Sequence, residues 1–119
     1  MTQALWVALG GALGALARHG VGVATARILG LAFPLGTLIV NAAGGLAMGA
    51  LAARLGPEAE SARLFWGVGV LGGFTTFSAF SLETVRLVER DPAAALLYVA
   101  TSLILSVGGC WLGLMLGRP

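Results

Sequence analysis

The 119-residue sequence has little charge and a single cysteine. Charged residues make up 10% of the chain, whereas a soluble domain carries about 25%. The mean hydropathy is +0.95, and together these values exclude an ordinary water-soluble fold. One cysteine excludes an intrachain disulfide, and the position of Cys110 in an apolar run favours a small core residue.

The chain also lacks lysine, so its net charge of +2 comes from arginine alone. Seven arginines spread over short connections are too few for a nucleic-acid surface, and no nucleic-acid partner is expected. No activated nucleophile, carboxylate pair or phosphate-binding glycine loop is present, which argues against an enzyme. No linker, low-complexity tail or internal repeat divides the sequence, which predicts one domain over 1–119.

Long uncharged runs fill most of the sequence. Three of them cover 28–53, 64–82 and 93–117, and a fourth covers 1–17 and continues beyond Arg18. About 20 apolar residues span a bilayer as a helix. The first run is too long for a removable signal peptide and lacks its small-residue cleavage pattern. The pattern predicts an all-α integral membrane protein, embedded in the lipid bilayer, with four transmembrane helices at 3–29, 33–53, 62–88 and 93–117.

The arginines are divided evenly between the two ends of these helices. Arg54, Arg63 and Arg118 flank the end that carries the N-terminus, and Arg27, Arg86 and Arg90 flank the other. Positive-inside bias normally sets orientation, and here it nearly vanishes. Either a short chain simply has few charges, or the protein inserts both ways up and assembles as an antiparallel dimer. Glycine pairs with GxxxG spacing, such as Gly10/Gly14 and Gly45/Gly49, favour close helix packing in lipid.

Polar residues within the apolar runs are functional candidates, because an unpaired polar group costs several kcal/mol in hydrocarbon. Arg18 either snorkels to the headgroups or serves a site. Asn41 either links helices or donates its NH2 to an anion. Thr37 lies one helical turn before Asn41 on the same face. Tyr98, Ser102 and Ser106 recur every fourth residue and form either a polar track or hydroxyls bonded to their own helix.

The stretch "GGFTTFSAFSLE" (72–83) predicts a break in the third helix near mid-membrane. Two glycines weaken helix propensity, and Thr75 and Thr76 compete for backbone hydrogen bonds. Irregular backbone at that depth must be buried or face a cavity, and its free carbonyls suit a cation. After the break, Phe77 and Phe80 share one face, either as core or as rings presenting partly positive edges.

The motifs "GALGALARHG", "GTLIVNAAGG" and "GVGVLGGFTTFSAFSLE", in this order on the first three runs, resemble the signature of the Fluc (CrcB-type) fluoride channels. The resemblance covers nearly the whole chain. It implies an antiparallel, dual-topology homodimer in the cell (inner) membrane of a prokaryote, with two fluoride pathways and a structural sodium ion at the dimer interface. His19, where an aromatic is common, and Ala79, where threonine is frequent, depart from the family pattern.

The resemblance also assigns roles to individual positions. Arg18 would lie at the pore vestibule, Thr37 would support the helix break, and the backbone carbonyls of Gly72 and Thr75 would bind sodium. The remaining matched positions would line the fluoride pathway: Asn41, Phe77, Ser78, Phe80, Ser81, Glu83, Tyr98, Ser102 and Ser106.

Fluoride is small and strongly hydrated, so a pathway needs successive hydrogen-bond donors without a charge that traps the ion. The expected function is passive, selective fluoride export that relieves fluoride toxicity. The alternative is a small four-helix, proton-coupled multidrug-type exporter, which needs a carboxylate deep in the first helix; this chain has none there. A third class is a membrane assembly subunit without transport.

Overall fold

The structure is a computed structural model that describes residues 2–119, and its regular elements are helices. Four stretches are long and apolar enough to cross a membrane: Thr2–Leu29, Leu35–Arg54, Glu60–Arg90 and Pro92–Gly117. The prediction of an all-α protein with four helices capable of spanning a membrane is confirmed. The four predicted segments overlap these stretches and differ from them by at most two residues at either end.

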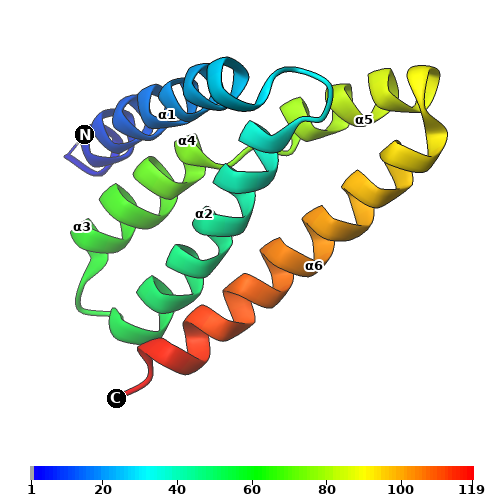
Figure 1. The fold of residues 1–119 in the computed structure, drawn as a ribbon. Coiled ribbons are helices and arrows are strands. Elements are labelled where there is room, and N and C mark those ends of the chain that lie inside the picture. Colours follow the sequence, from blue (N-terminus) through cyan, green and yellow to red (C-terminus); the bar gives the residue numbers. More distant parts are fainter. Residues whose placement is uncertain (1) are drawn as a thin grey trace.

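Three of the stretches are single helices: α1 (Thr2–Leu29), α2 (Leu35–Arg54) and α6 (Pro92–Gly117). The third span, Glu60–Arg90, comprises α3 (Glu60–Ala62), the π-helix η1 (Arg63–Leu71), α4 (Gly72–Phe74) and α5 (Ser78–Arg90). In Figure 1, α1 (blue) lies beside the first part of the third span, and α2 runs beside α6 (orange to red). The molecule is therefore built on two closely packed pairs of helices; α1 also contacts α2, and α5 packs against α6.

Glycine, aspartate and proline set the helix ends. Gly30 follows α1 with a φ of +79°, a left-handed conformation that glycine adopts without strain. Asp91 caps α6 by accepting a hydrogen bond from the N–H of Ala94 at 3.2 Å. Pro92 occupies the first helical position of α6, where its missing N–H has no helical partner to lose. Connections between the spans are consequently short.

Close backbone approach holds α1 against the third span. A Cβ added at Gly14 would meet the carbonyl oxygen of Val70, and one added at Gly10 would meet that of Phe65. The contact is reciprocal, because a Cβ at Gly73 would meet the backbone of α1. Only glycine allows this separation, as in small-residue packing of membrane helices.

The pair α2 and α6 is built in the same way. A Cβ at Gly49 would meet the carbonyl oxygen of Cys110, and a Cβ at Gly113 would meet that of Leu46. The backbones of α2 and α6 therefore lie in direct contact along the C-terminal half of α6, with no side chain between them at these glycines.

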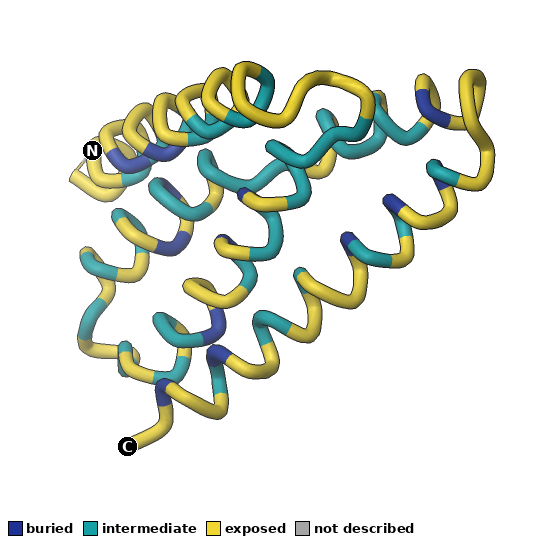
Figure 2. Tube along the Cα trace, in the orientation of Figure 1, coloured by how far each residue is buried: buried dark blue, intermediate teal, exposed yellow. Residues whose placement is uncertain are grey.

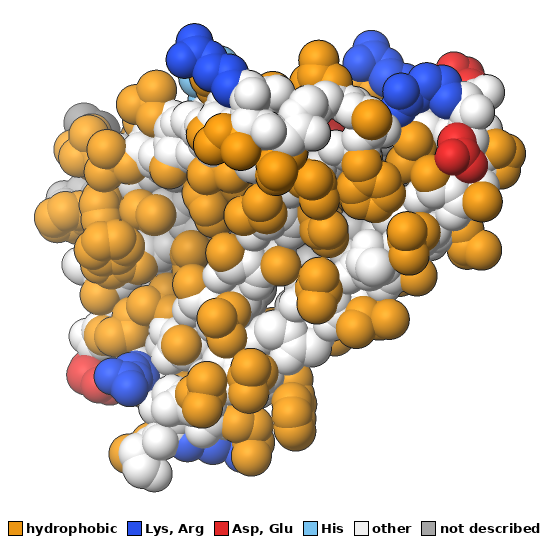
Figure 3. All heavy atoms as spheres, viewed as in Figure 1, with side chains coloured by type: hydrophobic (Ala, Val, Ile, Leu, Met, Phe, Trp, Pro, Cys, Tyr) orange, Lys and Arg blue, Asp and Glu red, His pale blue; other side chains and the backbone are white. Residues whose placement is uncertain are grey.

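The buried core is small, and few positions along the chain are fully buried (Figure 2). Most large apolar residues are exposed in the single chain. The core cluster consists of Leu87, Ala95 and Tyr98, packed against partly buried residues that include Phe33 and Phe80. In Figure 3, apolar side chains cover the middle of the molecule, and charged side chains gather towards its edges. This distribution is the one expected of a surface that faces lipid or other apolar protein surface.

Residues 75–77 of the third span are not helical. Thr75 follows α4 with φ −86° and ψ 162°, an extended conformation, and α5 begins only at Ser78. Figure 1 shows the extended link between α4 and α5. The Thr75 N–H still donates to the Leu71 carbonyl at 3.0 Å, and the Phe77 carbonyl still accepts from the Ser81 N–H at 2.8 Å. The backbone groups of Thr76, between them, need partners other than the regular helical ones.

Candidate functional site

Asn41 of α2 supplies partners to the link. The Thr76 N–H donates to Asn41 Oδ1 at 2.8 Å, and Asn41 Nδ2 donates to the Thr76 carbonyl at 2.9 Å. One side-chain amide therefore replaces both helical hydrogen bonds of a single residue. The structure shows the first of the two possibilities left open for Asn41, because its side chain links α2 to the third span. One of the two N–H donors of this amide remains available.

This arrangement removes the helical partners of two carbonyls. In a regular helix, Gly72 would accept from the N–H of Thr76, which donates instead to Asn41. Thr75 would accept from the N–H of Ala79, which donates instead to Thr76 Oγ1 at 3.1 Å. The carbonyl oxygens of Gly72 and Thr75 are therefore released from the helical ladder, and carbonyl oxygens are the ligands that broken helices offer to alkali cations.

Arg18 of α1 reaches the same region. Its Nε donates to the carbonyl oxygen of Gly73 at 3.0 Å. The guanidinium is thus directed at the third span next to the link. Arg18 and its neighbour His19 also line a hollow of 590 Å³ that includes Thr37, Thr76, Ala79 and Glu83.

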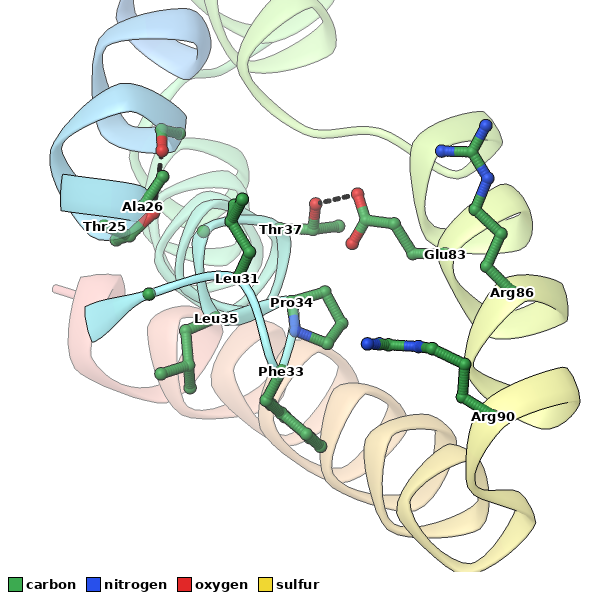
Figure 4. A pocket seen from close by; sticks show the side chains of 13 residues that line it. Thr25, Ala26, Leu31, Phe33, Pro34, Leu35, Thr37, Glu83, Arg86 and Arg90 are labelled. Carbon is green, nitrogen blue, oxygen red and sulfur yellow. Dashed lines mark hydrogen bonds between the residues drawn. The ribbon is translucent and has the colours of Figure 1, made fainter. Parts of the chain in front are cut away.

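Glu83 joins three helices. Thr37 Oγ1 of α2 donates to Glu83 Oε1 at 2.7 Å, and the Tyr98 hydroxyl of α6 donates to Glu83 Oε2 at 3.1 Å. Figure 4 shows Thr37 and Glu83 facing each other on the wall of a second hollow, of 340 Å³, into which Arg90 also points. Both carboxylate oxygens are therefore occupied by neutral hydroxyl donors.

Four aromatic rings continue from this cluster. Phe80 lies 5.2 Å from Tyr98 and 5.6 Å from Phe77, measured between ring centroids. Phe33 meets Tyr98 edge to face at 5.5 Å. Phe77 is 78% exposed in the single chain, so the row of rings leads from the core to the surface.

A groove of 320 Å³ lies between α2, the link and α6. Ser102 and Ser106 of α6 line it together with Asn41, Phe77 and Phe80. Ser102 is buried to 5% exposure, and its hydroxyl has no hydrogen-bond partner within residues 2–119. A buried hydroxyl without a partner costs free energy, so this group is available to a water or to a ligand that accepts a hydrogen bond.

The two remaining candidate serines lie beside the link. Ser81 Oγ donates to the Phe77 carbonyl at 2.8 Å, and Ser78 Oγ lies 3.4 Å from Thr76 Oγ1. Ser81 is therefore occupied by its own helix, whereas Ser102 is not. The structure thus brings Asn41, the aromatic pair and the α6 serines to one groove and places Arg18, Thr37 and Glu83 on the adjoining hollow.

Sequence reasoning missed two parts of this region. It did not identify the backbone of Thr76 as the partner of Asn41, and it did not predict the π-helix η1, which carries no distinctive sequence pattern. Within residues 2–119, no group of three or more His, Cys, Asp or Glu side chains could hold a metal.

Known proteins resemble this chain over nearly its full length. The family model described as "CrcB-like protein, Camphor Resistance (CrcB)" matches residues 5–114. A "Fluoride-specific ion channel FluC" from Caulobacter sp. is 53% identical, over 99% of this chain and 96% of the relative. Proteins of the same name from Hyphomonas neptunium and Rhodospirillum centenum are 50% and 52% identical, each over 99% of this chain and 97% of the relative.

Proposed function

Because this chain belongs to the CrcB family, we propose that it is a fluoride-specific ion channel. The observation that carries the proposal is the identity of 53% with a relative of that name, over 99% of this chain. It is a multi-pass membrane protein and not an enzyme. We further propose that it lies in the inner membrane and exports fluoride passively, which relieves fluoride toxicity.

The groove supplies the chemistry that fluoride requires. The hydroxyl of Ser102, the second N–H of Asn41 and the ring edges of Phe77 and Phe80 are weak or neutral donors on one surface. Such groups replace the hydration shell in small steps, and none carries a charge that would trap the ion. We propose that these groups form the pathway together with the hydroxyls of Ser78, Ser81, Tyr98 and Ser106, and that Glu83 takes part in it by holding the Tyr98 hydroxyl.

Arg18 and Thr37 have supporting roles in this proposal. Arg18 lines the 590 Å³ hollow, which would serve as an anion-attracting vestibule. Thr37 holds Glu83, and Asn41 holds the link, so both α2 side chains support the interruption of the third span. Thr75 is the middle residue of Glu60–Arg90, which supports our proposal that this interruption lies at mid-membrane depth.

We propose that the released carbonyls of Gly72 and Thr75 hold a structural sodium ion. Their oxygens have lost their helical donors, and Gly72 is exposed in the single chain, where a second copy could complete the site. Bound sodium would neutralise the partial negative charge of converging carbonyls. If so, the purified protein should unfold at a higher temperature in sodium than in choline salts, because the ion binds only the folded state. Equal unfolding temperatures would contradict this assignment.

We also propose an antiparallel homodimer with dual topology. The even distribution of arginines and the extensive exposed apolar surface support it. A Cys110→Ser, Ser61→Cys variant would carry its single thiol in α3, at the start of the third span. An impermeant thiol reagent outside sealed cells should label about half of the molecules. Labelling of all or none would indicate a single orientation.

No observation favours the multidrug-type exporter. Within the described chain, Glu83 is the acidic residue that lies at the site, and both of its oxygens accept hydrogen bonds from hydroxyls. Expression in a bacterium that lacks its own fluoride exporter tests the function. The channel should restore growth in fluoride and leave sensitivity to organic cations unchanged; protection against organic cations alone would support the exporter instead.

A further inference from the structure

Cys110 continues the stripe of polar side chains on α6. Tyr98, Ser102 and Ser106 are spaced by four residues, and Cys110 follows at the same interval. Each such step turns by about 40° around a helix, so the four side chains follow one slowly rotating face. Cys110 lines the same groove as Ser102 and Ser106. Sequence alone favoured a core position, but the thiol is only partly buried.

The groove itself points to a ligand independently of the cysteine. The Ser102 hydroxyl is buried on its wall without a partner. The facing wall comes from α2 and includes Gly44, Gly45 and Met48. Gly45 lets α2 approach the α6 backbone closely at Ser106, because a Cβ there would meet the Ser106 carbonyl oxygen. An anion that accepts a hydrogen bond from Ser102 would therefore lie in the same groove that Ser106 and Cys110 line.

We propose that Cys110 is the last member of the donor series in the ion pathway and the residue through which thiol-specific reagents block conduction. The inference rests on the proposed fluoride channel. A thiol S–H is a weak donor, so Cys110 is the weakest donor of the series. A Cys110→Ser substitution should therefore preserve or increase fluoride efflux, and Cys110→Val, which keeps a similar volume without a donor, should reduce it.

Methyl methanethiosulfonate is a suitable probe because it is small and neutral. The Cys110 thiolate attacks the sulfenyl sulfur, a new S–S bond forms, the S–SO2 bond breaks and methanesulfinate leaves. The thiol proton passes to the buffer. The attached methylthio group would occupy the groove at the level of Cys110.

The experiment compares three proteins in fluoride-loaded liposomes: the natural chain, Cys110→Ser, and Cys110→Ser with Ile104→Cys. Ile104 is 68% exposed and lies on the side of α6 opposite the stripe, so it is a matched control for attachment to the same helix. Intact mass reports the extent of modification. We expect the reagent to slow efflux from the natural chain by about tenfold and to leave the other two unchanged.

The outcomes distinguish failure of the proposed fluoride channel from failure of the proposed role of Cys110. Fluoride retention by all untreated proteins would contradict the proposed function itself. If untreated protein conducts, then unchanged efflux after complete modification of Cys110 would overturn the role of this residue, and so would a thiol that does not react. Equal inhibition of the Ile104→Cys control would also overturn it. If Cys110→Val reduces efflux and leaves the unfolding temperature unchanged, Cys110 acts in the pathway. If the unfolding temperature falls as well, Cys110 acts in packing and the proposal is overturned.

Discussion

The third span divides at residues 75–77 into two halves that meet their neighbours in different ways. The first half, α3 to α4, contacts α1 through glycine, so that backbone lies against backbone. The second half, α5, contacts α2 and α6 through side chains, and its Glu83 accepts hydrogen bonds from both. Between the halves, Asn41 holds the link at Thr76.

This difference separates the tasks of the two halves. Glycine contacts are dry and leave no room for a ligand, so the first half fixes the position of the link. The second half carries aromatic and hydroxyl groups beside a groove that contains an unpartnered Ser102 hydroxyl. Substitutions in the first half should therefore affect folding, and substitutions around the second half should affect conduction.

The largest expected effect is on folding, from Gly14→Ala. The added Cβ would meet the Val70 carbonyl oxygen, which belongs to the backbone and cannot move aside. Overpacking of this kind costs about 1–3 kcal/mol or more. Gly20→Ala is the control, because no atom lies within 4 Å of its added Cβ. Thermal unfolding in detergent should show a lower unfolding temperature for Gly14→Ala than for the natural chain, and an unchanged one for Gly20→Ala. Equal unfolding temperatures for all three proteins would contradict close packing in the first half.

Next in size is Asn41→Ala, which affects both folding and conduction. It leaves the N–H and carbonyl of Thr76 without partners, at about 1–3 kcal/mol for each buried group. Asn41→Asp keeps the acceptor for the Thr76 N–H and loses the donor to its carbonyl. Unfolding temperature and fluoride efflux should both fall, most in Asn41→Ala. An alanine variant with normal efflux would show that the link does not depend on this amide.

Phe77→Leu should affect conduction with little change in stability. Phe77 is 78% exposed in the single chain, so its loss should alter the free energy of unfolding by about 0.5 kcal/mol or less. Removal of its ring edge from the groove should slow fluoride efflux by about tenfold. Trp66→Leu removes an exposed aromatic ring from the first half and serves as the control. Equal slowing by both substitutions would remove the distinction between the halves.

The smallest expected effect on stability is from Ser102→Ala. Because the hydroxyl is buried without a partner, its removal should leave the unfolding temperature unchanged or raise it slightly. Fluoride efflux should nevertheless fall severalfold, because a donor is lost. Thr101→Ala on the same helix is the comparison, since the Thr101 hydroxyl already donates to the Leu97 carbonyl. A destabilised Ser102→Ala protein would indicate a structural hydroxyl.

The sequence predicts the helices of this fold well because lipid selects long uncharged runs, and these are visible residue by residue. The stripe of Tyr98, Ser102 and Ser106 is also predictable, since it follows from helical periodicity. The partner of Asn41 is not, because it is the backbone of a residue 35 positions away, whose identity leaves no pattern. The unpartnered state of Ser102 depends on what surrounds it in three dimensions.

Fluoride and chloride efflux from liposomes that contain the purified natural chain tests the central claim most directly. A fluoride electrode and a chloride electrode follow the two ions from matched vesicles under the same membrane potential. The account predicts rapid loss of fluoride and chloride loss no faster than from protein-free vesicles. Chloride efflux as fast as fluoride efflux, or retention of both ions, would contradict it.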